Sequence, residues 1–75
     1  DNRISIGDSS YIGINAVIIG NIEIGRHCVI GANSVVTESI PDYCVAAGNP
    51  AKIVKRFNRT TEKWERVKNE NIDAR

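Results

Sequence analysis

An aliphatic residue returns every six positions through the first half of this chain. The series contains five isoleucines and one valine, at Ile6, Ile12, Ile18, Ile24, Ile30 and Val36. Glycine follows four of these six residues, and a small or aliphatic residue stands two places before each. A fixed short period is typical of repeat architectures, in which small units stack on their neighbours. The period therefore limits the fold more strongly than any other feature of the sequence.

The repeat also predicts how the units stack. Residues two apart, such as Ile22 and Ile24, fall on one side of a short strand. The chain matches itself at an offset of eighteen, which aligns Ile4 with Ile22 and Ile40. Nineteen residues are Ile or Val and none is Leu, a composition that favours strands. We predict an all-β parallel solenoid of triangular section, with three strands per coil. An antiparallel meander would have no reason to repeat at eighteen.

Some outward positions of the repeat are apolar. They are Tyr11, Val17, Val29 and Val35. An apolar strip on the outside of the prism would suggest a subunit interface, most simply around a threefold axis. Scattered surface aliphatics are the alternative interpretation.

The six-residue rhythm is interrupted at Asp42, which follows Pro41. We predict that residues 1–47 are β-helix coils and that the solenoid stops at this break or one strand later. Residues 48–59 are predicted to be a basic exit loop, because glycine and proline near its start impose a turn.

The last part of the chain differs from the repeats in composition. Residues 60–70, TTEKWERVKNE, combine helix-forming residues with a threonine pair able to cap a helix. Trp64 and Val67 are three apart, as on one side of a helix. We predict a short amphipathic C-terminal α-helix over 60–70, with a tail to residue 75.

Charge is balanced overall but locally uneven. Ten Lys and Arg against nine Asp and Glu leave a net charge of +1, so no nucleic-acid partner is expected. No acid lies between Tyr43 and Thr61, whereas four bases fall within eight positions, at Lys52, Lys55, Arg56 and Arg59. A local phosphate site is one interpretation of these bases, and cations that keep a solenoid end soluble are the other.

Hydropathy, the cysteines and the start of the chain predict where the protein is located and whether the sequence is part of a longer one. The longest uncharged stretch is broken by Gly and Asn, so no membrane span is expected. Two Cys match no zinc spacing and are too few for a disulfide scaffold, which predicts free thiols and a cytoplasmic location. The chain contains no Met and starts without a basic, apolar leader, so we expect it to be part of a longer protein.

The stretch IGDSSYIGINAVIIGNIEIGRHCVIGANSVVTESIPDYCVAAGNPAKIVKRF resembles the C-terminal half of the hexapeptide-repeat acyltransferases. It is most similar to the branch of serine, galactoside, maltose and xenobiotic O-acetyltransferases, with capsule-sugar acetyltransferases also close. The segments IGANSVVT and AAGNPAK are more specific than the hexads. The resemblance covers residues 3 to about 57. It implies a left-handed parallel β-helix, a homotrimer, and an acetyl-CoA site between adjacent subunits.

The resemblance also implies which residues contact acetyl-CoA. Ala32 matches an alanine whose main chain lies along the pantetheine arm, and Thr37 matches the threonine after SVV. Glu38 stands where the family commonly has Lys. Ile14 stands where relatives carry a small or polar residue beside the thioester. The basic pair near the nucleotide end of the coenzyme is matched by two lysines, Lys52 and Lys55.

No catalytic residue is expected in this chain. The resemblance implies direct transfer, in which a His base takes the proton of the acceptor hydroxyl and backbone amides hold the oxyanion. In the family that His lies in an earlier coil, and we interpret His27 as a surface corner residue. Cys28 is predicted to point inward as an unreactive thiol, whereas the direction of Cys44 is not predicted. A carbonic anhydrase of this fold needs three His for its metal, and the chain has one, so we predict no metal.

The sequence thus predicts the C-terminal part of a CoA-dependent acyltransferase. The expected reaction is O-acetyl transfer from acetyl-CoA to a hydroxyl of a small molecule or sugar, and the fragment lacks the catalytic His. The alternative is a noncatalytic β-helix used as an assembly or scaffold module.

Overall fold

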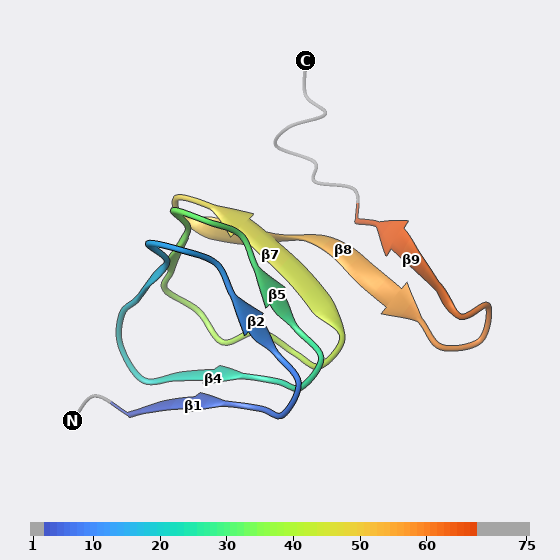
Figure 1. The fold of residues 1–75 in the computed structure, drawn as a ribbon, viewed down its shortest axis with the longest axis horizontal. Coiled ribbons are helices and arrows are strands. Elements are labelled where there is room, and N and C mark those ends of the chain that lie inside the picture. The colour runs from blue at the N-terminus through green and yellow to red at the C-terminus, as the bar shows by residue number, and fades with distance from the viewer. Residues whose placement is uncertain (1–2, 68–75) are drawn as a thin grey trace, which may run out of the picture.

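Three stacked turns of chain form a prism from which a β-hairpin projects (Figure 1). The computed structural model describes residues 3–67. Its strands are β1 (Ile4–Ile6), β2 (Tyr11–Ile12), β3 (Val17–Ile18), β4 (Ile22–Ile24), β5 (Val29–Ile30), β6 (Val35–Val36), β7 (Cys44–Gly48), β8 (Ala51–Asn58) and β9 (Lys63–Arg66). They form three sheets, in the orders β1-β4, β2-β5-β7-β8-β9 and β3-β6. Each side of the prism is one sheet.

The predicted period of eighteen is confirmed in the first two coils. β1 pairs with β4, β2 with β5 and β3 with β6, each in parallel and each at an offset of eighteen residues, as in the pair Tyr11 and Val29. The antiparallel meander is therefore wrong for this part of the chain. The core consists of residues from the inward positions, namely Ile22, Ile24, Cys28, Ile30, Val36, Ile40, Cys44 and Ala46. The repeat thus builds one continuous apolar column.

The corners use left-handed backbone conformations. Asn15 and Asn33, eighteen residues apart, have φ values of 63° and 62°. His27 and Tyr43 occupy another corner in successive coils, with φ values of 56° and 60°. Asn tolerates this conformation well because its short polar side chain can bond to nearby backbone. These two corners therefore keep the same backbone conformation from coil to coil.

The third coil is two residues shorter than predicted. Ile40 pairs with Ile24 rather than with Ile22, so the predicted alignment of Ile40 with Ile22 is wrong. The chain crosses this corner through Ser39, whose Oγ accepts the Glu23 N–H at 2.9 Å. The Ile40 N–H donates to the Glu23 carbonyl oxygen at 2.9 Å, which fixes the new register. The rhythm then resumes, and β7 adds to β5 with Val45 opposite Val29. The solenoid therefore ends one strand after the break at Asp42.

Residues 48–67 differ most from the prediction. The expected exit loop contains β8, the longest strand, which pairs antiparallel with β7. The predicted C-terminal helix is wrong over 60–67, where a turn leads into β9, and residues 68–70 lie outside the described part. The Asn58 Oδ1 accepts the N–H groups of Thr60 and Thr61 at 2.9 and 3.1 Å. The threonine pair thus forms a hairpin turn rather than a helix cap.

Pairing with β8 explains why the helix does not form. Phe57 lies opposite Trp64, with the ring centroids 5.3 Å apart. The Val67 N–H donates to the Val54 carbonyl oxygen at 3.0 Å. These tertiary contacts override a weak local helix propensity. Within residues 3–67, no helix is long and apolar enough to cross a bilayer.

Candidate functional site

Two of the predicted coenzyme positions share one corner of the prism. The Asn33 N–H donates to the Ile14 carbonyl oxygen at 2.9 Å, so Ile14 lies one coil away from Ala32. Both residues are exposed, and the Ile14 side chain retains 74% of its accessible area. A Cβ atom on the neighbouring Gly13 would lie 2.6 Å from the Ala32 backbone nitrogen. Only glycine therefore allows the two coils to approach so closely here.

The third coil reaches the same corner at Gly48. Its N–H donates to the Oγ of Ser34 at 3.1 Å, and Ser34 is completely buried. This bond anchors the turn between β7 and β8 to the preceding coil. Ile14, Ala32 and Gly48 therefore form a column along the prism axis.

Thr37 and Glu38 lie at the next corner. Both are exposed and follow β6 directly. The outer face between the two corners carries the outward side chains of Val17 and Val35, which are opposite each other in the register. An apolar face thus runs from the Ala32 corner to the Thr37 corner, and a flexible chain could lie along it.

The four residues of the predicted apolar strip lie on two faces of the prism. Val17 and Val35 lie on the sheet of β3 and β6, whereas Tyr11 and Val29 lie on that of β2 and β5. Tyr11 retains 65% of its accessible area and Val17 retains 47%. Exposed apolar side chains therefore flank the Ala32 corner on both sides.

An irregularity in β8 puts Lys52 and Lys55 on one face. Residues three apart in a regular strand point to opposite faces. In this strand, Lys55 lies opposite Val45 and Ile53 opposite Ala46, so Val54 is an extra, bulged residue. Lys52 lies opposite Ala47, which points outward like Val45. Both lysines therefore point away from the core on the outer face of the five-stranded sheet.

The hairpin continues this outer face beyond the lysines. Lys55 lies opposite Arg66, and Phe57 lies opposite Trp64 two residues further along. Arg66 and Trp64 had not been assigned to the site from the sequence. The segment KWER has only one apolar residue and a helix-forming composition, so no clear strand signal marked these two residues. Four side chains thus form a patch, half cationic and half aromatic, which we call the hairpin patch (Lys55, Phe57, Trp64 and Arg66).

His27 is confirmed as an exposed corner residue, but it does not stand alone. Its ring stacks on Tyr43, with centroids 4.9 Å apart and planes 13° apart. Tyr43 in turn packs on Phe57 at 5.8 Å, and the Arg59 guanidinium carbon lies 5.1 Å from the Tyr43 ring centroid. The rings therefore form a ladder that ties the hairpin to this corner. His27 and Ala32 are at opposite ends of β5, five residues apart.

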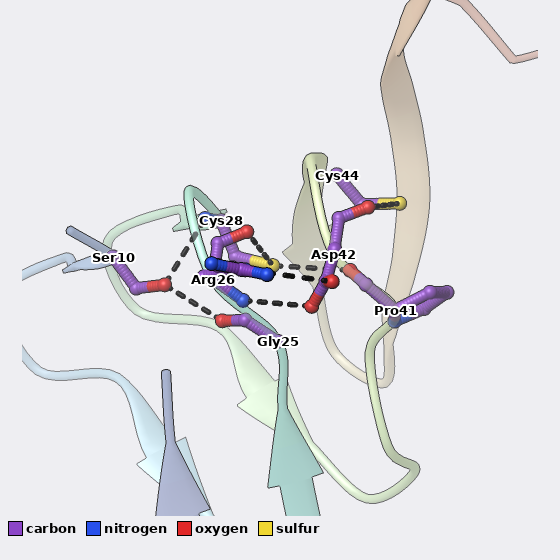
Figure 2. A network of polar contacts seen from close by, with 7 residues as sticks. All are labelled: Ser10, Gly25, Arg26, Cys28, Pro41, Asp42 and Cys44. Carbon is purple, nitrogen blue, oxygen red and sulfur yellow. Dashed lines mark hydrogen bonds and ion pairs between the residues drawn. The ribbon is translucent and has the colours of Figure 1, made fainter. Parts of the chain in front are cut away.

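The inward direction predicted for Cys28 is confirmed (Figure 2). Its thiol points to the Pro41 carbonyl oxygen at 3.1 Å, and Cys28 and Cys44 are both free and completely buried. The Ser10 Oγ accepts the Cys28 N–H at 3.1 Å and donates to the Gly25 carbonyl oxygen at 2.8 Å. Burial raises the pKa of the Cys28 thiol above its ordinary value. Cys28 is therefore kept neutral and inert.

Other candidate chemistry is limited in this part of the chain. Among residues 3–67, no group of three or more His, Cys, Asp or Glu side chains is placed to hold a metal ion. A shallow hollow lies over β1 and β4, lined by Ser5, Glu23, Ser39 and their neighbours. None of the six predicted coenzyme residues lines it. The candidate site is therefore the Ala32 corner together with the outer face of β8.

Parallel coils built from six-residue repeats define this part of the chain as a parallel β-helix. Residues 3–38 match the family described as bacterial transferase hexapeptide (six repeats), and this part of the chain is built from the repeats of that family. The predicted left-handed fold is confirmed by its structural neighbours.

Three similar proteins illustrate the relationship. A serine acetyltransferase of Haemophilus influenzae is 46% identical over 56 residues, which cover 75% of this chain and 21% of that protein. A maltose O-acetyltransferase from Clostridium difficile 630 superposes with a TM-score of 0.74 at 43% identity, covering 77% of this chain and 31% of that one. A hexapeptide-repeat acetyltransferase from Vibrio cholerae, complexed with acetyl coenzyme A, gives a TM-score of 0.73 at 37% identity, covering 76% and 31%. The chain thus spans between a fifth and a third of the length of these proteins.

Proposed function

We propose that this chain is the donor-binding part of an acetyl-CoA-dependent acetyltransferase that acts on a hydroxyl of a small molecule or sugar. The observation that carries the proposal is the bulge in β8, which turns Lys52 and Lys55 to the same exposed face. A β-helix scaffold would need neither lysine there. Two aligned cations suit the phosphates of coenzyme A, because a charge-assisted contact is about twice as strong as a neutral one. The relatives named above are acetyltransferases, which supports the same donor.

The chain's own residues would hold the coenzyme along its length. The apolar face between Ala32 and Thr37 would cover the pantetheine arm, with the exposed Ile14 near the thioester. Lys52 and Lys55 would receive the nucleotide end. Glu38 is exposed at the Thr37 corner and carries the wrong sign for a phosphate, so it would lie beside the coenzyme without binding one. When bound, the thioester supplies the acyl group, and these residues orient it.

We assign the general base to residues outside this chain. The only histidine, His27, stacks on Tyr43 at the far end of β5 from Ala32. A segment of five residues spans at most roughly 16 Å, whereas a base must lie within hydrogen-bond reach of the acceptor hydroxyl.

A homotrimer is part of the proposal, because two outer faces of the prism carry exposed apolar side chains. Val17→Glu would place a charge on one of these faces, and we expect the trimer to dissociate in sedimentation experiments. Tyr11→Glu would test the other face. A monomeric wild-type protein would contradict the assignment. The two buried free thiols are compatible with the cytoplasmic location that we also propose.

Acetyl-CoA titration of the protein by calorimetry tests the donor site. Lys52→Glu and Lys55→Glu should each weaken binding at least about tenfold, and the effect should shrink at high salt. Lys63→Glu is the matched control, because Lys63 lies on the opposite face of the same hairpin, beside Trp64 in sequence. Equal affinity in all variants would overturn the phosphate role of the lysines.

A further inference from the structure

The two faces of the β8–β9 hairpin differ in how their charges are paired. On one face Arg56 lies directly opposite Glu65, a favourable cross-strand pair. On the other face Lys55 lies directly opposite Arg66. Like charges in this arrangement destabilise a sheet. The outer face therefore holds two cations at a position where the inner face has opposite charges.

No carboxylate compensates for these two cations within the described residues. The one ion pair found among residues 3–67 joins Arg26 to Asp42, on the prism. Glu65 points to the other face of the hairpin, where its Oε2 accepts a hydrogen bond from the Asn58 amide at 3.0 Å. Residues 51–67 carry six bases and two acids. The Lys55 and Arg66 pair is therefore arranged to receive an anion.

An aromatic surface lies immediately beside this pair. Phe57 and Trp64 are two residues from Lys55 and Arg66 on the same strands, and hence on the same face. The Trp64 ring meets Phe57 edge-on at an interplanar angle of 60° and retains 44% of its accessible area. Trp64 is thus exposed enough for a planar ring to stack on it. A ligand that suits this surface carries an anion next to a planar ring, as a phosphorylated nucleoside does.

We propose that Lys55 and Arg66 together bind a phosphate monoester while Trp64 stacks on the attached base. The inference rests on the proposed function and deepens it, since it makes Arg66 a specificity-determining residue for the phosphorylated nucleoside of coenzyme A. The outer face of the five-stranded sheet leads from the Ala32 corner past Lys52 to this patch. Arg66 then makes the protein bind coenzyme A more tightly than the form that lacks the 3′-phosphate.

The test compares acetyl-CoA with 3′-dephospho-acetyl-CoA by calorimetry on the intact protein. Arg66→Gln should weaken acetyl-CoA binding about tenfold or more and leave the dephospho form almost unchanged. Trp64→Leu should weaken both forms alike, because both contain the base. Lys63→Gln, which removes one positive charge from the opposite face of β9, is the matched control and should change neither.

The unliganded protein provides a second readout. Removing Arg66 relieves the repulsion with Lys55, so Arg66→Gln should raise the denaturant midpoint, whereas Lys63→Gln should not. Arg66→Lys should retain most of the discrimination between the two coenzyme forms. A merely structural role for Arg66 would lower the midpoint instead and would affect both forms equally.

The outcomes separate this inference from the proposed function. If Lys55→Glu weakens acetyl-CoA binding but Arg66→Gln does not, Arg66 does not bind the 3′-phosphate, so this inference fails and the proposed function stands. If wild-type protein does not bind acetyl-CoA, the proposed function fails. If Arg66→Gln abolishes binding of inorganic phosphate but preserves acetyl-CoA affinity, the patch takes free phosphate and the coenzyme assignment is overturned.

Discussion

Replacement of Ser34 by alanine probes the link between the β-helix and the proposed donor site. The Ser34 hydroxyl is completely buried and accepts the Gly48 N–H at 3.1 Å, at the turn that leads to Lys52. The substitution removes this acceptor and little volume. A buried donor left unsatisfied costs about 1–3 kcal/mol. Gly48 itself is exposed, so water replaces part of the bond, and we expect about 1 kcal/mol.

The matched control is Ser39→Ala. The Ser39 Oγ also accepts one backbone N–H, from Glu23 at 2.9 Å, but both residues are exposed. Its removal should change the free energy of unfolding by less than about 0.5 kcal/mol. Chemical denaturation of both variants measures the difference, and acetyl-CoA titration shows whether loosening the turn weakens binding. Equal losses of stability in the two variants would refute the idea that Ser34 anchors the turn.

Three further predictions concern the prism. Gly13→Ala should lower the free energy of unfolding by about 1–3 kcal/mol in denaturant titrations, because the new methyl group meets the Ala32 backbone. His27→Ala should leave the turnover of the longer parent enzyme almost unchanged in steady-state kinetics, since His27 packs on Tyr43 at the far end of β5; a thousandfold loss would contradict this. The Cys28 thiol should resist alkylation until the protein unfolds. Folding raises the pKa of the Cys28 thiol, so the thiol contributes fully to the free energy of unfolding below its ordinary pKa of 9.0. This contribution is lost as the pH rises through the pKa of the folded state. Chemical denaturation at pH 8 and at pH 10.5 measures the difference.

The regular part of the fold could be predicted because one rule generates it. Every hexad repeats the same local choice of an inward aliphatic residue and a corner. Ile24, Ile30 and Val36 are consequently buried as expected. The two-residue shortening before Ile40 could not be predicted, because a corner can lose residues without disturbing the inward pattern on either side. A periodicity count does not detect such a deletion.

The hairpin could not be predicted for a different reason. Its structure depends on contacts between Phe57 and Trp64 and between Val54 and Val67, which are far stronger determinants than the helix propensity of the intervening residues. The bulge at Val54 is also a pairing feature, invisible until the partner strand is known. Lys52 and Lys55 were singled out by charge, but their common face follows only from that pairing.

The cationic part of the candidate site lies where the repeat is broken. A strict hexad places identical environments above one another, so it can build a column or a flat face but cannot bring unlike groups together. After the shortened corner, β7 extends beyond the repeat and β8 turns back on it, and the bulge then aligns two lysines that a regular strand would separate. Pairing of β9 adds Arg66 and Trp64 to the same face. The repeat thus serves as a rigid support, and the departures from it create the cationic and aromatic surface on which donor recognition is proposed to depend.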